Sequence, residues 1–407
     1  MSVFKGKGSF DRRIWVLFWS RLIDGAGFSI VSPFLALYMS QELGVSMTLV
    51  GLVLLVAGVA GAGGSLIGGI IADARGRRKV MVTAMLLRCL SFLALALVIG
   101  VYPDLWLIAG LLALNFFLGG AFDPANNAMV ADVVEPARQL EAYGLLRVAW
   151  NLGFAVGPAI GGIIASVSFE YAFLASAAVS FLAAIIVLLF LRESYVPKER
   201  AKRERLSLDL SSLSLPFLAF CLFCVPMFIM AGQFGTTFPV YSNERLGIDP
   251  FIIGVVFGIN GLMVALLQLP LARWLSRYNK FACMLFGTLV YALGFLGLAF
   301  VQEGWGLAAA MVIITLGEMV VTPVATSLTA AYSHEDDRGR YMGVFGLVAS
   351  LGWFTSSLIG GVIYDNASSG LLLWGIIAFM GLFTALGMAL LWQRSRSSRG
   401  IGSAGSG

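Results

Sequence analysis

Three carboxylate side chains, Asp24, Asp123 and Glu318, lie within apolar stretches of the sequence. An ionisable group inside a bilayer costs about 2.5 to 3.5 kcal/mol, so each one is a functional candidate. Burial disfavours the charged form of a carboxylic acid. In a cavity that is alternately wet and closed, the affinity of the acid for a proton would therefore change. We therefore predict a proton-coupling role for these acids. The alternative for each is a static ion pair with a neighbouring arginine, and Arg21 or Arg147 could neutralise Asp123 permanently.

The composition excludes a soluble globular protein. Hydrophobic residues make up 59% of the chain and charged residues only 12%, whereas charged residues approach about a quarter of a soluble domain. Continuous apolar stretches of roughly 20 residues, long enough to cross a bilayer as helices, recur along the whole length. The sequence predicts an all-α membrane protein with twelve transmembrane helices, at residues 14–40, 45–71, 80–101, 105–131, 141–165, 171–191, 215–241, 252–274, 281–301, 306–331, 341–363 and 371–392.

Lysine and arginine are unevenly distributed between the two sides of these spans. With the N-terminus inside, Arg21, Arg88 and Arg147 lie within spans and Arg245 faces outward, while all the other basic residues lie on the cytoplasmic side. This asymmetry predicts that both termini are cytoplasmic. The predicted divisions are a cytoplasmic N-terminus at 1–13, a six-helix bundle at 14–191, a charged cytoplasmic linker at 192–214, a second six-helix bundle at 215–392 and a flexible tail at 393–407.

The two predicted bundles repeat one another in sequence. Five residues of the first half recur 203 positions later, and five more recur 199 positions later. Such a repeat predicts two related bundles with a substrate site between them near the midplane of the membrane. The first set is Tyr38, Leu43, Gly44, Gly51 and Gly58, which recur as Tyr241, Leu246, Gly247, Gly254 and Gly261; the second is Pro124, Gly144, Gly153, Gly161 and Gly162, which recur as Pro323, Gly343, Gly352, Gly360 and Gly361.

A short charged turn separates the second and third spans. Glycine permits a tight turn and close helix packing, and the acid and the arginines between them would form an ion-pair cluster at the membrane edge. The spacing resembles motif A of the major facilitator superfamily. In the second-half counterpart, Ala272–Lys280, Ser276 replaces the acid, which confines the predicted ionic gate to the first half. The motif residues are Gly69, Asp73, Gly76, Arg77 and Arg78.

The fifth span carries small residues at regular intervals together with one proline. Small residues clear a helix face for close contact, and a proline inside a helix removes a backbone donor. The pattern is similar to motif C, which the same superfamily associates with exporters that exchange substrate for protons. The second half has Ser356-Ser357 in place of the central Gly-Pro pair. The residues of the pattern are Gly144, Gly153, Gly157, Pro158, Gly161 and Gly162.

The resemblance covers residues 12–394 and is closest to twelve-helix drug:proton antiporters, especially small multidrug exporters with an acid in the tenth helix. It implies that spans one, four, seven and ten line a central cavity. Asp132 resembles the acid that several antiporters set against the motif A arginines, which would latch the halves in an outward-open state. The fourth span has no central arginine of the kind found in motif B of many relatives, so the proton path can differ from theirs.

Polar and aromatic positions on these spans predict the cavity lining. Asn115, Gly119, Asp123 and Asn127 recur every four residues and form one stripe of a helix, which should face water rather than lipid. Aromatic and polarizable side chains beside a carboxylate suit amphipathic or cationic guests. The predicted cavity residues are Phe28, Asn115, Asn127, Met230, Gln233, Thr237 and Tyr241.

These features predict a proton-coupled exporter of drug-like molecules in the plasma membrane, acting as a monomer without cofactor other than the proton gradient and without nucleic-acid partners. A sugar or metabolite exporter and a lipid or lysolipid transporter are alternatives with the same fold. The four cysteines lie inside predicted spans and the one histidine in a loop, so we expect neither disulfides nor a metal site, and no enzyme activity.

Overall fold

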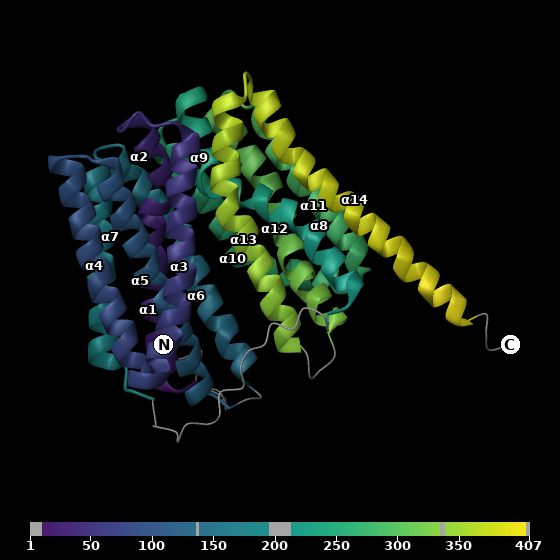
Figure 1. Cartoon of the computed structure of the whole chain (residues 1–407), viewed down its shortest axis with the longest axis horizontal. Coiled ribbons are helices and arrows are strands. Elements are labelled where there is room, and N and C mark those ends of the chain that lie inside the picture. Colours follow the sequence, from purple (N-terminus) through teal and green to yellow (C-terminus); the bar gives the residue numbers. More distant parts are fainter. Residues whose placement is uncertain (1–9, 136–137, 195–212, 334–337, 404–407) are drawn as a thin grey trace. The chain divides into compact units, whose positions relative to one another are not determined.

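The structure is a computed structural model that describes residues 10–135, 138–194, 213–333 and 338–403. The described residues form helices joined by short turns (Figure 1). Twelve helical segments are long and apolar enough to cross a membrane, which confirms the predicted number of spans.

Within the described residues, seven α-helices precede residue 191 and seven follow it. Those of the first half are α1 (Arg12–Val31), α2 (Leu35–Gln41), α3 (Met47–Arg75), α4 (Arg77–Val101), α5 (Leu105–Val133), α6 (Gln139–Ala165) and α7 (Phe169–Phe190). Those of the second half are α8 (Leu215–Gly232), α9 (Thr237–Val240), α10 (Pro250–Leu275), α11 (Lys280–Gly297), α12 (Gly304–Tyr332), α13 (Arg338–Asn366) and α14 (Gly370–Ser403).

The chain divides into two compact units. Unit 1 consists of residues 1–45, 52–202 and 249–265, and unit 2 of residues 46–51, 203–248 and 266–407. In unit 1, α1 packs against α6 and α7, and α4 packs against α5 and α7. In unit 2, α8 packs against α13 and α14, and α11 packs against α12 and α14.

Turn residues at equivalent places in the two halves adopt the same backbone conformation. Gly44 ends the first span with φ of +62°, and Gly247, its counterpart 203 positions later, has φ of +67°. Glycine lacks a Cβ atom and therefore adopts this left-handed conformation without the steric penalty of other residues. The sequence repeat thus extends to local geometry outside the helices.

The seventh span is interrupted, whereas the sequence predicts a continuous helix over 215–241. Helix α8 ends at Gly232, a 3₁₀ turn follows at Gln233–Gly235, and α9 is succeeded by a π-helical turn at Tyr241–Arg245. Two glycines within four residues weaken the helix, and Pro239 supplies no backbone N–H to it. The interruption changes which side chains share a face on either side of it.

Candidate functional site

A buried ion pair joins α1 to α4 in unit 1. An Arg88 guanidinium nitrogen lies 2.5 Å from an Asp24 carboxylate oxygen, and both residues are only 4% exposed. Two charges withdrawn from water in this way are tolerated because each compensates the other. Asp24, predicted as a proton carrier, is therefore paired with Arg88, one of the three arginines that the sequence places within spans.

Arg21 extends this pair to a second acid. Its guanidinium lies 3.6 Å from the other Asp24 oxygen and forms a closer ion pair with Asp123 of α5. The Asp123 side chain is 47% exposed, in contrast to 4% for that of Asp24. The structure thus pairs Asp123 with Arg21, one of the two arginines considered from sequence, and leaves Asp123 as the accessible acid of this cluster.

The predicted polar stripe of α5 faces these arginines along part of its length. Arg88 Nε donates to Asn115 Oδ1 at 3.3 Å, and Asn115 Nδ2 donates to Ser91 Oγ at 3.4 Å. A Cβ atom at Gly119 would lie 3.3 Å from the central carbon of the Arg88 guanidinium, so glycine leaves room for that group. Asn127, further along the helix, is exposed. We call Arg21, Asp24, Arg88, Asn115 and Asp123 the charged cluster.

Aromatic rings surround the charged cluster. The Phe28 ring lies 5.9 Å from the rings of both Phe116 and Trp150, and the Arg88 guanidinium lies 5.6 Å from the Phe28 ring. Arg21 lies over Trp150 at 4.3 Å. All three aromatic side chains are partly exposed. They offer flat apolar surface beside an accessible carboxylate, a combination suited to amphipathic cations.

The four predicted cavity residues of the seventh span lie in the interior of unit 2. Met230, Gln233 and Thr237 are 0% exposed and Tyr241 is 4% exposed. Gln233 Nε2 donates to the Ser356 carbonyl at 3.0 Å, and Thr237 Oγ1 donates to Gln233 Oε1 at 2.6 Å. The prediction assumed one face of a continuous helix. The helix is broken after Gly232, and these side chains pack within unit 2. Their role as cavity residues stays a prediction.

Glu318 lies on α12 in unit 2 and is partly buried. The preceding residue, Gly317, packs directly on α11, since a Cβ atom there would lie 2.5 Å from backbone atoms of Tyr291. Asp24 and Asp123 belong to unit 1. The three predicted proton-coupling acids are thus divided between the units, and within unit 1 Asp24 and Asp123 come together at Arg21.

The turn between α3 and α4 has the contacts expected of an ionic cluster. Gly76 adopts φ of +105°, and Arg77 lies 3.2 Å from Asp73 and 3.2 Å from Asp132. Gly69 approaches α5, where its Cβ would lie 3.5 Å from Pro124. One arginine therefore ties the end of α3 to the end of α5.

Glu193, which follows α7, contacts the same turn, and the sequence did not predict this contact. Its carboxylate accepts from the backbone N–H of Arg77 at 3.0 Å and of Arg78 at 3.2 Å, which caps the N-terminus of α4. A Cβ atom at Gly76 would lie 2.5 Å from Glu193 Oε2, so the glycine makes room for the cap. Glu193 follows α7 in a segment predicted only as a solvated linker, and its sequence position gives no signal of this contact.

The glycines of α6 bring its backbone against α1. Cβ atoms would lie 2.2 Å from Leu22 O at Gly153, 1.9 Å from Ser29 Oγ at Gly157 and 2.1 Å from Ile30 O at Gly161. The helix continues through Pro158. The remaining motif C glycines differ: a Cβ at Gly162 would lie 2.5 Å from Pro250 O, within the same unit, and Gly144 has open space around it.

The described residues contain no group of three or more histidine, cysteine, aspartate or glutamate side chains arranged to hold a metal ion. The four cysteines are buried and free.

The amino-acid sequence is similar to known transporters over most of its length. The family model of the Major Facilitator Superfamily matches residues 17–323 and 218–406. The chain is 28% identical over 391 residues to an uncharacterised MFS-type transporter, YttB, of Bacillus subtilis (strain 168), covering 94% of this chain and 96% of that protein. It is also 28% identical over 378 residues to the multidrug resistance protein MdtH of Photorhabdus laumondii, covering 91% of this chain and 92% of that protein.

Solved transporter structures share the fold. A peptide transporter, POT, superposes with a TM-score of 0.77 at 16% identity, covering 96% of both chains. The nucleoside transporter NupG superposes with a TM-score of 0.77 at 17% identity, covering 93% of this chain and 99% of that one. At these identities the likeness concerns the fold alone. With its twelve helical spans and the family match along most of its length, this protein belongs to the major facilitator superfamily and is a membrane transporter, not an enzyme.

Proposed function

We propose that this transporter is a proton-coupled antiporter that exports amphipathic or cationic drug-like molecules. The multidrug resistance proteins among its relatives and the glycine pattern of α6 support this assignment. We further propose that it acts as a monomer in the plasma membrane, with both termini in the cytoplasm, as the distribution of basic residues indicates.

The observation that carries the proposal is that Arg21 is shared between two acids. Asp24 is fully buried and also paired with Arg88, whereas Asp123 is half exposed and pairs with Arg21. With both carboxylates ionised, the two arginines and two acids balance in charge. A proton on Asp123 would leave one positive charge in excess, and Arg21 could then turn to Asp24.

Protons and cationic substrates would therefore compete for the charged cluster. Deprotonated Asp123, with Phe28 and Trp150 beside it, provides a carboxylate and aromatic surface for a cation. A protonated Asp123 leaves the arginines in excess and repels that cation. Binding of one species favours release of the other, which is the requirement for exchange.

The neighbours of Asp24 favour a different role for that acid. Asp24 forms a buried ion pair with Arg88. If Asp24 took up a proton, the Arg88 cation would stay buried without a compensating charge. We assign proton exchange to Asp123 in unit 1 and to Glu318 as a second carrier in unit 2, and we assign positioning of Arg88 to Asp24.

The cluster of Arg77, Asp73 and Asp132 is proposed to be a conformational gate. These residues join the ends of α3 and α5, and Glu193 fixes the start of α4 beside them. Loss of the ion pair between Arg77 and either acid would allow the turn to move during alternating access.

Transport of ethidium, an amphipathic cation, in proteoliposomes tests the proposal. An imposed pH gradient should drive ethidium accumulation by the unmodified protein. Asp123→Asn, which resembles the protonated acid, should weaken ethidium exchange at equal pH and lose the gradient-driven accumulation. Glu318→Gln, examined separately, tests the second carrier by the same comparison.

Glu141→Gln is the matched control, because Glu141 is an exposed acid outside the charged cluster and its side chain is 63% exposed. It should leave both activities unchanged. Ethidium transport by the unmodified protein that ignores the pH gradient would overturn proton coupling. Gradient-driven accumulation that survives Asp123→Asn would overturn the assignment to that acid.

A further inference from the structure

The turn between α10 and α11 is the second-half counterpart of the motif A turn, and its basic residues lie open on the surface. Arg273, Arg277 and Lys280 are exposed, and none of the ion pairs between described residues involves them. Ser276 stands where the first half has Asp73, and its hydroxyl donates to the Arg273 carbonyl at 2.7 Å. Three cations thus lie within eight residues, without an acid between them.

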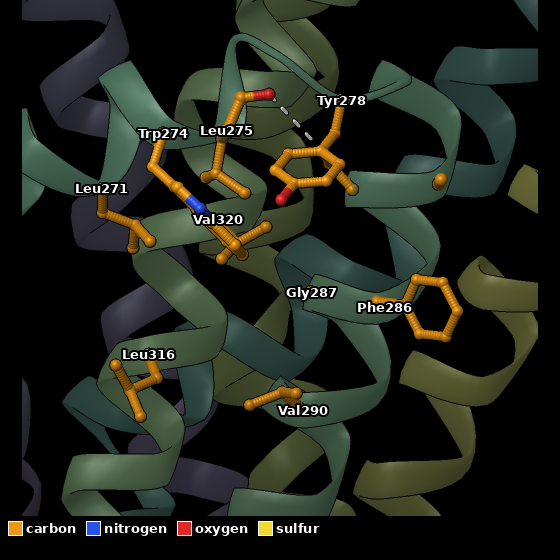
Figure 2. Close-up of a pocket in the computed structure, with 11 residues that line it drawn as sticks. Leu271, Trp274, Leu275, Tyr278, Phe286, Gly287, Val290, Leu316 and Val320 are labelled. Carbon is orange, nitrogen blue, oxygen red and sulfur yellow. Dashed lines mark hydrogen bonds between the residues drawn. The ribbon is translucent and has the colours of Figure 1, made fainter.

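An apolar pocket opens directly beside this turn. It has a volume of about 500 Å³ and lies entirely in unit 2, between the end of α10, the first half of α11 and the middle of α12. Figure 2 shows Trp274, Leu275 and Tyr278 at one end of the pocket and Val290 and Leu316 at the other. The residues that line it are Leu271, Trp274, Leu275, Tyr278, Ala282, Cys283, Phe286, Gly287, Val290, Leu316 and Val320.

The pocket opens on the outer surface of the helices. Trp274 and Tyr278 at its basic end are each 52% exposed, and Phe286 is 63% exposed. Gly287 lets α12 approach closely, since a Cβ atom there would lie 2.5 Å from a Val320 methyl group. The helices α10, α11 and α12 each belong to a candidate membrane span, and a lipid chain that enters the pocket would do so through this opening.

We propose that this pocket is a binding site for an anionic phospholipid. An acyl chain would lie along the apolar lining toward Val290 and Leu316, and the phosphate would lie at the turn, beside Arg273, Arg277 and Lys280. Basic residues at the edge of a pocket between transmembrane helices attract anionic headgroups, and tryptophan and tyrosine are typical of that depth. The apolar lining accepts the chain of any lipid, and the three cations select the charge of its headgroup.

A comparison with the first-half turn shows why the charges of the turn determine whether it can bind an anionic headgroup. There the counterpart of Lys280 is Arg77, which is already paired with Asp73 and Asp132. In the second half the corresponding acid is absent. Lys280 Nζ donates to the Ser327 carbonyl at 3.4 Å, and none of the three cations is paired with an acid of the described residues. The structure therefore assigns lipid binding to unit 2 and ionic gating to unit 1.

Native mass spectrometry of the detergent-solubilised full chain tests the proposal. Dioleoyl phosphatidylglycerol, which is anionic, and dioleoyl phosphatidylcholine, which has no net charge, are titrated separately and their apparent affinities compared. Each cation is expected to contribute about a fivefold change in affinity, so the triple variant Arg273→Gln/Arg277→Gln/Lys280→Gln should bind phosphatidylglycerol about a hundredfold more weakly at low salt.

Further variants test separately whether lipid binding depends on the cations of this turn and on the volume of the pocket. Arg12→Gln/Arg75→Gln/Lys79→Gln removes the same charge from exposed positions of unit 1 and should retain the affinity of the unmodified protein. Ala282→Phe should fill the pocket and weaken binding of both lipids at least tenfold, and Val290→Trp provides a second filling change should Ala282→Phe fail to fold.

Preferential binding of phosphatidylglycerol that is lost in the unit 2 triple variant and retained in the unit 1 triple variant supports the site. Equal binding of the two lipids, or equal loss in the two triple variants, would overturn it. Affinity unchanged by a folded pocket-filling variant would show that the lipid binds elsewhere.

Discussion

The turn between α3 and α4 and the turn between α10 and α11 are counterparts in sequence, yet they are stabilised by different partners. Gly76 has no side chain, and a remote residue, Glu193, caps α4. Its counterpart 203 positions later is Asn279, whose own side chain accepts from the backbone N–H of Phe281 at 2.9 Å and caps α11. The first turn therefore depends on residues from other helices, whereas the second is self-sufficient and leaves its cations exposed.

The helix pairs α1 with α6 and α8 with α13 show a second difference between the halves. In unit 1, the hydroxyl of Ser29 occupies the space left by Gly157. In unit 2, the counterpart of Ser29 is Gly232, and the hydroxyl of Ser356 occupies the space left by that glycine. The same contact is retained with serine and glycine exchanged between the helices. In each unit, one of the two helices carries a glycine at the point where the helices cross.

The largest predicted effect concerns the buried pair of unit 1. The counterpart of Asp24 in unit 2 is Met227, an apolar residue that is 3% exposed. Asp24→Met would give unit 1 the residue of unit 2 and leave Arg88 buried without its partner, which should lower the free energy of unfolding by about 3 to 5 kcal/mol. Denaturant unfolding in detergent micelles measures this change.

The double variant Asp24→Met/Arg88→Met is the control for that experiment. It removes both charges and should recover most of the lost stability, because apolar residues can replace a buried ion pair. A double variant as unstable as the single one would contradict an ion-pair origin of the effect.

An exchange of serine and glycine tests the second difference. Gly157→Ser alone should destabilise the protein by about 1 to 3 kcal/mol, because its side chain would overlap that of Ser29. Ser29→Gly/Gly157→Ser places serine and glycine as at Gly232 and Ser356 and should recover the part of this loss that comes from the overlap with Ser29. The new Cβ atom would still lie 2.6 Å from the Ala26 carbonyl oxygen. Thermal unfolding of the three proteins compares them. If the double variant is no more stable than the single one, the two crossings are not equivalent.

The remote cap of α4 can be removed by Glu193→Ala, which deletes the accepting oxygens. A helix N-cap contributes about 0.5 to 2 kcal/mol, and a carboxylate also interacts with the helix dipole. We expect a loss within that range and faster hydrogen exchange at the amides of Arg77 and Arg78. Asn279→Ala should have a similar local effect at Phe281 in unit 2. Unchanged exchange at Arg77 and Arg78 would show that the carboxylate does not hold these amides.

The smallest effect on stability is expected for Ser276→Asp, which restores the acid of the first-half turn. An exposed ion pair with Lys280 is worth at most about 1 kcal/mol. The same substitution should weaken phosphatidylglycerol binding about fivefold, because it places a negative charge among the three cations. Native mass spectrometry and thermal unfolding of one preparation measure both quantities. Stronger binding would contradict the role of these cations.

Hydropathy was sufficient to predict the number of spans and the helical fold, because a bilayer imposes the same length and polarity on every crossing. The motif spacing was sufficient for the pair of Asp73 and Arg77, which lie four residues apart. The contact of Asp132 with Arg77 was implied by the resemblance to antiporters, and the structure contains it.

Contacts set by tertiary packing could not be predicted in this way. The seventh span breaks after Gly232, and Met230 and Gln233, expected on a cavity face, are buried. The pairing of Asp24 with Arg88 depends on how α1 meets α4, which periodicity within either helix does not determine. The proton-coupling and substrate-binding roles assigned to these residues remain predictions.

The position of Glu193 has a mechanical consequence. It lies just after α7, two residues before residue 195, where the connection to the second half of the sequence begins. Glu193 accepts from the first amides of α4, so a displacement of the chain at Glu193 would act directly on the start of that helix. The connection between the halves of the sequence thus begins beside the turn that we propose as a conformational gate.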